Sequence, residues 1–289
     1  ILANRGTTAA PLEVDYRESL SRSEGEGGRA TVTLAPREQR IISDAFAWLR
    51  GLGVAVGPAG PAPLAGRLRV TGPPGATGLW AAARVASPSP GGGAYGVFLP
   101  GVRPDPASGA GAWIAGLRSD GEVRSNVAFV HAGPPGSGAV ELEFRVFDVL
   151  AGGAPAGEPA RYTLAEGEWR QLADPLRPLG VASGWVRVTR IAGTAPWLAY
   201  GVLNDGAGPG LRTGDGAYVP AVASASTSAA RIAPDDFSYL GAFRLPAGGE
   251  RPLTFEYGGN AMTFRPGGDP GGAGDGFPGS LFVSGHDRM

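Results

Sequence analysis

The chain has 289 residues, of which 43% are hydrophobic and 18% are charged, a balance typical of globular domains rather than disordered chains. Its formal net charge of -1 provides no general attraction to nucleic acid or to an anionic membrane. Cysteine is absent, which excludes disulfides and thiolate metal sites, and no apolar run reaches the ~20 residues of a membrane-spanning helix.

Glycine and proline punctuate the whole chain. The 50 Gly and 27 Pro lie between short apolar runs and show no Gly-X-Y period, which excludes a collagen helix. They predict many turns between short strands, and therefore an all-β protein.

The first predicted module covers residues 1–102. Alternating apolar and charged residues predict strands at 12–17 and 30–35. Asp44 then stands where a helix N-cap belongs, so a short helix is expected to hold Phe46 and Leu49 against the strands. Because the pattern starts abruptly at Ile1, we interpret this module as truncated at its N-terminus, with an unpaired sheet edge.

The second predicted module covers residues 103–222 and opens with a feature that the first lacks. Strand-like runs at 113–118 and 123–130 flank Asp120-Gly121, a dipeptide that favours a tight turn between paired strands. We therefore expect a β-hairpin here.

The rest of the second module repeats the first in the same order, with an offset of roughly 117 to 130 residues. The matched pairs are 12–17 with 140–145, 30–35 with 160–165, 66–71 with 184–189, Trp80 with Trp197, Val85 with Val202, and Pro100-Gly101-Val102 with Pro220-Ala221-Val222. Asp174 matches Asp44 and precedes Pro175, so a second short helix is expected to pack Leu176 and Leu179.

The repeat predicts whether each of three tryptophan side chains is buried or faces outward. Trp80 and Trp197 occupy matching positions and are predicted to lie in the cores. Trp185 replaces Arg67 and precedes Val186, so its indole is expected to face outward. An exposed tryptophan can stack on a sugar or anchor a protein partner, which makes Trp185 the candidate ligand-binding residue; an isolated surface aromatic is the alternative.

The two modules resemble the tandem immunoglobulin-like or fibronectin-like β-sandwiches of secreted bacterial surface proteins. The resemblance covers residues 1–222 and implies about seven strands per module, but no particular activity, because such sandwiches host many roles. The Cys…Trp…Cys pattern of antibody domains is absent.

The C-terminal part differs in pattern. Residues 223–233 are small and predict a linker, and 234–289 predict an incomplete β domain. Three strand-like runs, at 237–246, 257–264 and 280–287, resemble the first blade of a β-propeller.

No catalytic constellation is present in the sequence. The Gly-x-Ser-x-Gly motif is missing, and a P-loop is excluded because the chain has no lysine. His131 is interpreted as a strand-end residue and His286 as a propeller residue. Asp269 and Asp275 lie in a glycine-rich loop and are the candidate calcium ligands, although the EF-hand spacing is absent and a plain loop is the alternative.

These features favour a non-enzymatic structural, spacer or adhesion segment of a secreted or cell-surface bacterial protein. The alternative is a pair of accessory modules, for which carbohydrate binding is one candidate role, attached to a catalytic or ligand-binding propeller. The expected partner is a glycan or another surface protein, with no nucleic acid, no membrane insertion and no cofactor other than calcium.

Overall fold

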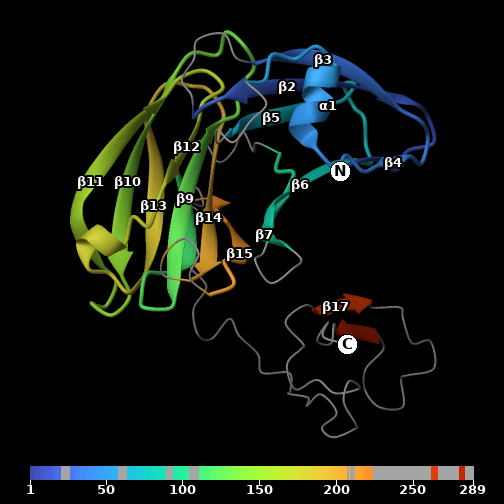
Figure 1. Cartoon of the computed structure of the whole chain (residues 1–289). Helices are drawn as coiled ribbons and strands as arrows, with labels where there is room; N and C mark the ends of the chain where they lie inside the picture. The colour runs from blue at the N-terminus through green and yellow to red at the C-terminus, as the bar shows by residue number, and fades with distance from the viewer. Residues whose placement is uncertain are drawn as a thin grey trace, which may run out of the picture. The chain divides into compact units, whose positions relative to one another are not determined.

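The computed structural model describes residues 1–20, 27–57, 64–88, 94–103, 111–206, 208, 212–223, 262–265 and 280–283. Residues 1–228 form one compact unit and residues 229–289 a second. The described part is predominantly β-structure, in several sheets (Figure 1). None of its helices has the length and apolar character needed to cross a membrane.

The first module contains seven strands and one α-helix among its described residues. They are β1 (Leu2–Asn4), β2 (Ala10–Glu18), β3 (Gly27–Leu34), β4 (Gln39–Arg40), α1 (Ala45–Gly51), β5 (Gly66–Thr71), β6 (Leu79–Pro88) and β7 (Ala94–Pro100).

The second module contains nine described strands and a 3-10 turn. They are β8 (Gly111–Arg118), β9 (Val123–His131), β10 (Val140–Asp148), β11 (Ala154–Leu164), β12 (Trp169–Leu172), η2 (Arg177–Leu179), β13 (Ser183–Ala192), β14 (Trp197–Asp205), β15 (Gly216–Pro220) and β16 (Val222–Ala223).

The strands of the two modules pair in the same order. In the first module β1 lies between β4 and β6, and β2 lies between β3 and β5. In the second, β9 lies between β12 and β14, and β10 lies between β11 and β13. The pairing therefore defines equivalent positions, such as Asn4 with His131 and Arg67 with Trp185.

Each module encloses an apolar core between two sheets, an arrangement compatible with a β-sandwich. In the second module, side chains of β8, β10 and β13 meet those of β9 and β14 around the fully buried Phe129, Leu142 and Val186. In the first module, β1, β2 and β3 contribute to a smaller core that includes Leu12 and Val14. Helix α1 adds Leu49, which is buried, and Phe46, which packs against this core.

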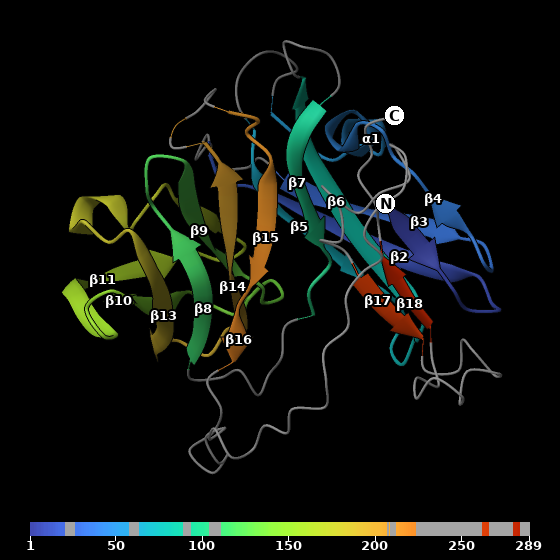
Figure 2. The same ribbon diagram turned by 90° about the horizontal axis from the view of Figure 1, so that it is seen from below.

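The two modules share one sheet. Its eight strands follow the order β12-β9-β14-β15-β7-β6-β1-β4, and β15 pairs in parallel with β7 at Gly216 and Val97 (Figure 2). Two tandem modules held apart by a link would not share backbone hydrogen bonds, so residues 1–223 form a joined pair.

The prediction of a β-hairpin around Asp120-Gly121 is wrong, because the two flanking strands do not pair with each other. β8 belongs to a five-stranded sheet of order β11-β10-β13-β8-β16, whereas β9 belongs to the eight-stranded sheet, so the connection crosses from one sheet to the other. The Asp120 carboxylate accepts hydrogen bonds of 2.8 Å from the backbone N–H groups of Glu122 and Val123. This local turn redirects the chain without requiring the flanking strands to pair.

The described strands of the first module include no counterpart of β8 beside β5. Among the described strands β5 pairs with β2 alone, and its inward-facing Leu68 is 42% exposed. The equivalent Val186 is fully buried, because β8 covers it in the second module.

The first predicted helix is confirmed and the second is wrong. Asp44 caps α1, its Oδ1 accepting from the Ala47 N–H at 2.9 Å. In the second module the helix is replaced by the three-residue η2, and Asp174 adopts φ 44 instead of capping. Pro178 has no N–H to extend a helix, and the left-handed Gly180 ends the turn, which leaves Leu176 buried but Leu179 40% exposed.

Trp197 is buried, as predicted, whereas the prediction for Trp80 is wrong because Trp80 is 41% exposed. Asn4 pairs with Leu79, and the equivalent His131 pairs with Trp197. The counterpart of Trp197 is therefore Leu79, which packs against the first core. A one-residue shift in a strand reverses the face of every side chain, and this shift turns Trp80 outward.

In the C-terminal unit, β17 (Met262–Arg265) and β18 (Ser280–Val283) form an antiparallel pair. They overlap two of the three predicted strand-like runs. The remaining run at 237–246, residues 224–233 of the predicted linker, and the candidate calcium ligands Asp269 and Asp275 lie outside the described residues, whereas Ala223 belongs to β16.

Candidate binding surface

Trp185 belongs to a group of aromatic side chains on the outer face of the five-stranded sheet. Because alternate residues of β13 point to opposite faces, the buried Val186 and Val188 direct Trp185 and Arg187 outward. Phe147 of β10 lies directly opposite Trp185, and Trp113 of β8 lies opposite Arg187. We call Trp113, Phe147, Trp185 and Arg187 the aromatic surface.

The rings of the aromatic surface contact one another. The Phe147 and Trp185 ring centres are 6.0 Å apart at an interplanar angle of 15°, a stacked pair. The Trp113 and Phe147 centres are 5.5 Å apart. The Arg187 Cζ lies 5.6 Å from the Trp113 ring centre, within the range of a cation–π interaction.

Mutual packing leaves each of these rings half-buried rather than fully exposed. The turn after β10 closes over Trp185 at Gly153, where a Cβ atom would come within 2.8 Å of the Trp185 ring. Gly153 also has φ 81, so a glycine satisfies both the backbone and the close approach. The prediction that Trp185 faces outward is confirmed, but its indole is held by neighbours.

The equivalent face of the first module makes a different contact. There the strand pairing makes Arg67 the counterpart of Trp185 and Arg17 the counterpart of Phe147. The match of 12–17 with 140–145 expected from the sequence is therefore wrong by two residues, because Ala10 rather than Leu12 occupies the position of Val140. Arg67 is only 6% exposed, and its Nη1 donates to the carbonyl oxygens of His131 at 3.1 Å and Gly133 at 2.9 Å. This face therefore lies against the end of the second module, just beyond β9.

A buried ion pair completes this contact. Arg67 Nη2 donates to Asp15 Oδ2 at 2.8 Å, and Asp15 is 1% exposed. Burial lowers the pKa of the Arg67 guanidinium, and the Asp15 carboxylate opposes that shift. Two carbonyl acceptors and one carboxylate offset part of the desolvation of the guanidinium, whose buried Nε has no hydrogen-bond partner among the described residues. We call Asp15, Arg17 and Arg67, with the facing end of the second module, the module joint.

Two further contacts close the module joint. The backbone N–H of Trp169 donates to Ser19 Oγ at 2.9 Å. Gly167 faces the arginines so closely that a Cβ atom there would lie 2.8 Å from Arg17 Cγ. The two modules therefore meet through backbone acceptors, a buried ion pair and the shared sheet.

Of the other residues considered from the sequence, His131 is buried and hydrogen-bonded, and the rest lie outside the described part. His131 ends β9, is fully buried and has Nε2 2.7 Å from the Gly138 carbonyl oxygen. Within the described residues no group of three or more His, Asp or Glu side chains could hold a metal ion. His286 lies outside them, as do Asp269 and Asp275.

Comparison of the chain with protein-family models, with curated protein sequences and with solved structures gave no match.

Sequence reasoning missed the partners of Trp185 and the whole module joint. Trp113 and Phe147 carried a signal, because each places an aromatic residue at an outward position of a strand whose other face is apolar. Arg67 and Asp15 carried none, since a charged residue at an outward strand position ordinarily faces water.

Proposed function

We propose that residues 1–222 are two β-sandwich modules that act as a non-enzymatic structural and adhesion segment of a secreted or cell-surface bacterial protein. The observation that carries the proposal is the module joint. A spacer must hold its parts at a fixed separation, and modules joined by a flexible linker alone do not. Here a buried ion pair and a shared sheet restrict movement of one module against the other.

Calorimetric unfolding of the full chain tests this coupling. If the module joint couples the modules, they should unfold in a single transition whose calorimetric and van't Hoff enthalpies agree. The Arg67→Ala variant should separate the unfolding of the two modules into two transitions. Arg84→Ala, which removes an exposed arginine from β6 of the same module, should not. A separate transition for each of the two modules in the unaltered chain, counted apart from any transition of residues 229–289, would contradict the proposal.

The aromatic surface favours a second candidate function, carbohydrate binding. Stacked and tilted aromatic rings with an adjacent guanidinium suit the apolar faces and hydroxyl groups of sugars. The test of carbohydrate binding is whether insoluble polysaccharides remove the full-length protein from solution and retain it. Trp113→Ala and Trp185→Ala should each abolish retention, whereas Trp80→Ala, which removes an exposed tryptophan from the first module, should leave it intact. Equal retention of all three variants would exclude the aromatic surface as the binding site.

A further inference from the structure

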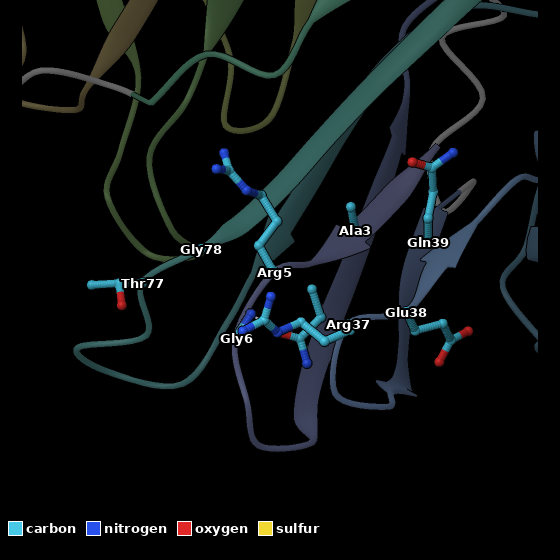
Figure 3. Close-up of a pocket in the computed structure, with 9 residues that line it drawn as sticks. Ala3, Arg5, Gly6, Arg37, Glu38, Gln39, Thr77 and Gly78 are labelled. Carbon is cyan, nitrogen blue, oxygen red and sulfur yellow. The ribbon is translucent and has the colours of Figure 1, made fainter. Parts of the chain in front are cut away.

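An open depression of about 730 Å³ lies at one end of the first module, lined by Ala3, Asn4, Arg5, Gly6, Arg37, Glu38, Gln39, Thr77 and Gly78 (Figure 3). Arg5 and Arg37 are exposed, and their side chains have no ion-pair or hydrogen-bond partner among the described residues. Both extend toward the side of Thr77 and Gly78, whereas Glu38 points the other way (Figure 3).

Glu38 does not neutralise the two arginines. Its carboxylate accepts from the Ala35 N–H at 2.7 Å and pairs with Arg40 Nη2 at 2.7 Å. These bonds, that from Ala35 foremost, lower the pKa of Glu38, so the carboxylate stays ionised but engaged. The depression therefore presents two unopposed guanidinium groups.

The region of the second module that is equivalent to this depression belongs to the module joint, where it contacts Arg67 of the first module. The equivalence follows from shared hydrogen bonds: the Asn4 N–H donates to the Glu38 carbonyl at 2.8 Å, and the His131 N–H donates to the Glu168 carbonyl at 2.8 Å. The Glu168 carboxylate accepts from the Ala165 N–H, as that of Glu38 does from Ala35.

The equivalent ends of the two modules differ at three charged positions, and each difference makes the end of the first module more positive than that of the second. Ala132 corresponds to Arg5, Glu166 to Pro36 and Gly167 to Arg37. The formal charge of the three positions changes from -1 (Glu166) to +2 (Arg5 and Arg37). In the second module Glu166 favours the charged form of Arg67. The end of the second module therefore attracts the Arg67 cation, whereas the equivalent end of the first module repels cations.

Arg37 keeps an unfavourable backbone conformation at this position. Its φ is 61, close to the φ of 76 at Gly167, and this left-handed region disfavours any residue that carries a side chain. A side chain retained at a position suited to glycine often has a functional role.

We propose that this depression binds the carboxylate of an acidic sugar such as a uronic acid. A guanidinium group matches the planar carboxylate and binds it through charge-assisted hydrogen bonds, and the depression offers two such groups. The described lining offers hydroxyl and amide groups at Thr77 and Gln39 and no aromatic or large aliphatic side chain. Sugar hydroxyls suit such a lining, whereas a peptide segment ordinarily needs an apolar anchor. The choice of a sugar rests on the proposed adhesion role.

Titration calorimetry of the full chain tests the site with three polymers of matched length: oligogalacturonate, neutral oligogalactose and polyglutamate. Oligogalacturonate should bind, more weakly as salt rises, and the other two should not. Arg5→Ala and Arg37→Gly should each weaken binding about tenfold or more. Arg84→Ala removes the same charge from exposed β6 and should leave binding unchanged.

Arg37→Gly also supplies its own folding control. Because it restores the glycine found in the equivalent turn, its melting temperature should equal or exceed that of the unaltered chain. Absence of oligogalacturonate binding, or binding unaffected by both variants, would overturn the site. Equal binding of polyglutamate would overturn the assignment to a sugar. None of these results alters the calorimetric coupling of the modules, so the two proposals fail separately.

Discussion

The environments of Trp185 and Trp197 differ because Trp197 points to the inner face of its sheet and Trp185 to the outer face of another sheet. Trp197 is 4% exposed within the second core, whereas Trp185 lies on the aromatic surface beside Phe147. Burial of a large aromatic side chain contributes more to stability than a half-exposed stacking contact does.

Trp197→Ala should therefore destabilise the protein by about 3–5 kcal/mol, as expected for deletion of a large core side chain. Trp185→Ala should cost less than half as much. Chemical denaturation of both full-length variants measures the difference. Equal losses would mean that the facing of β13 or β14 described above is incorrect.

Arg67 illustrates what a sequence pattern cannot reveal about single residues. Charged residues at alternate positions correctly indicated which faces of β2 and β5 point outward. The pattern gave no sign that this outward face is buried by the second module, since that depends on contacts between residues about 65 positions apart. Outward and solvent-exposed are therefore different properties.

At the scale of elements, strand existence was predictable and strand pairing was only partly so. Alternation predicted β2, β3, β10 and β11, and the repeat predicted their order. The Asp-Gly turn misled because a tight turn fixes local chain direction but not the sheet in which the next strand pairs. The α1 cap was readable because capping depends on neighbouring residues alone.

The Asp120 turn gives a pH-dependent prediction at this scale. Hydrogen bonds from the backbone of Glu122 and Val123, with Arg118 nearby, lower the pKa of Asp120 below its value of about 3.9 in an unfolded chain. Ionised Asp120 therefore stabilises the fold above the unfolded pKa, and this contribution disappears as the pH falls through the folded pKa.

Asp120→Asn should accordingly lower the midpoint of urea unfolding at pH 7, and the difference from the unaltered chain should shrink toward zero in acid. Asn keeps an acceptor oxygen for the turn, so the comparison isolates the charge. A difference that stays constant from pH 7 to pH 3 would show that the charge of Asp120 has no part in stabilising the turn.

At the scale of the whole molecule, the repeat could be read from the sequence but the joining of its copies could not. Matching segments indicated two similar modules in tandem. Their contact depends on positions where the copies differ, such as Arg67 against Trp185 and Arg37 against Gly167. Differences between repeats therefore carried the information about how the modules meet.

The energetics of the module joint can be measured by a double-mutant cycle. Arg67→Met retains much of the side-chain volume but leaves the Asp15 carboxylate buried without its main partner, which should cost about 3–5 kcal/mol. Adding Asp15→Asn should recover a large part of that loss, because both charges are then gone. Additive losses in the double variant would show that the two side chains do not interact.

The most direct measurement of the central claim is the distance between the two modules. Since the chain has no cysteine, Thr33→Cys on β3 and Thr163→Cys on β11 give two unique, exposed positions for spin labels. Electron–electron dipolar spectroscopy of the full chain should show one narrow distance distribution, which broadens when Arg67→Ala is added. A broad distribution in the chain with intact Arg67 would contradict a joined pair of modules.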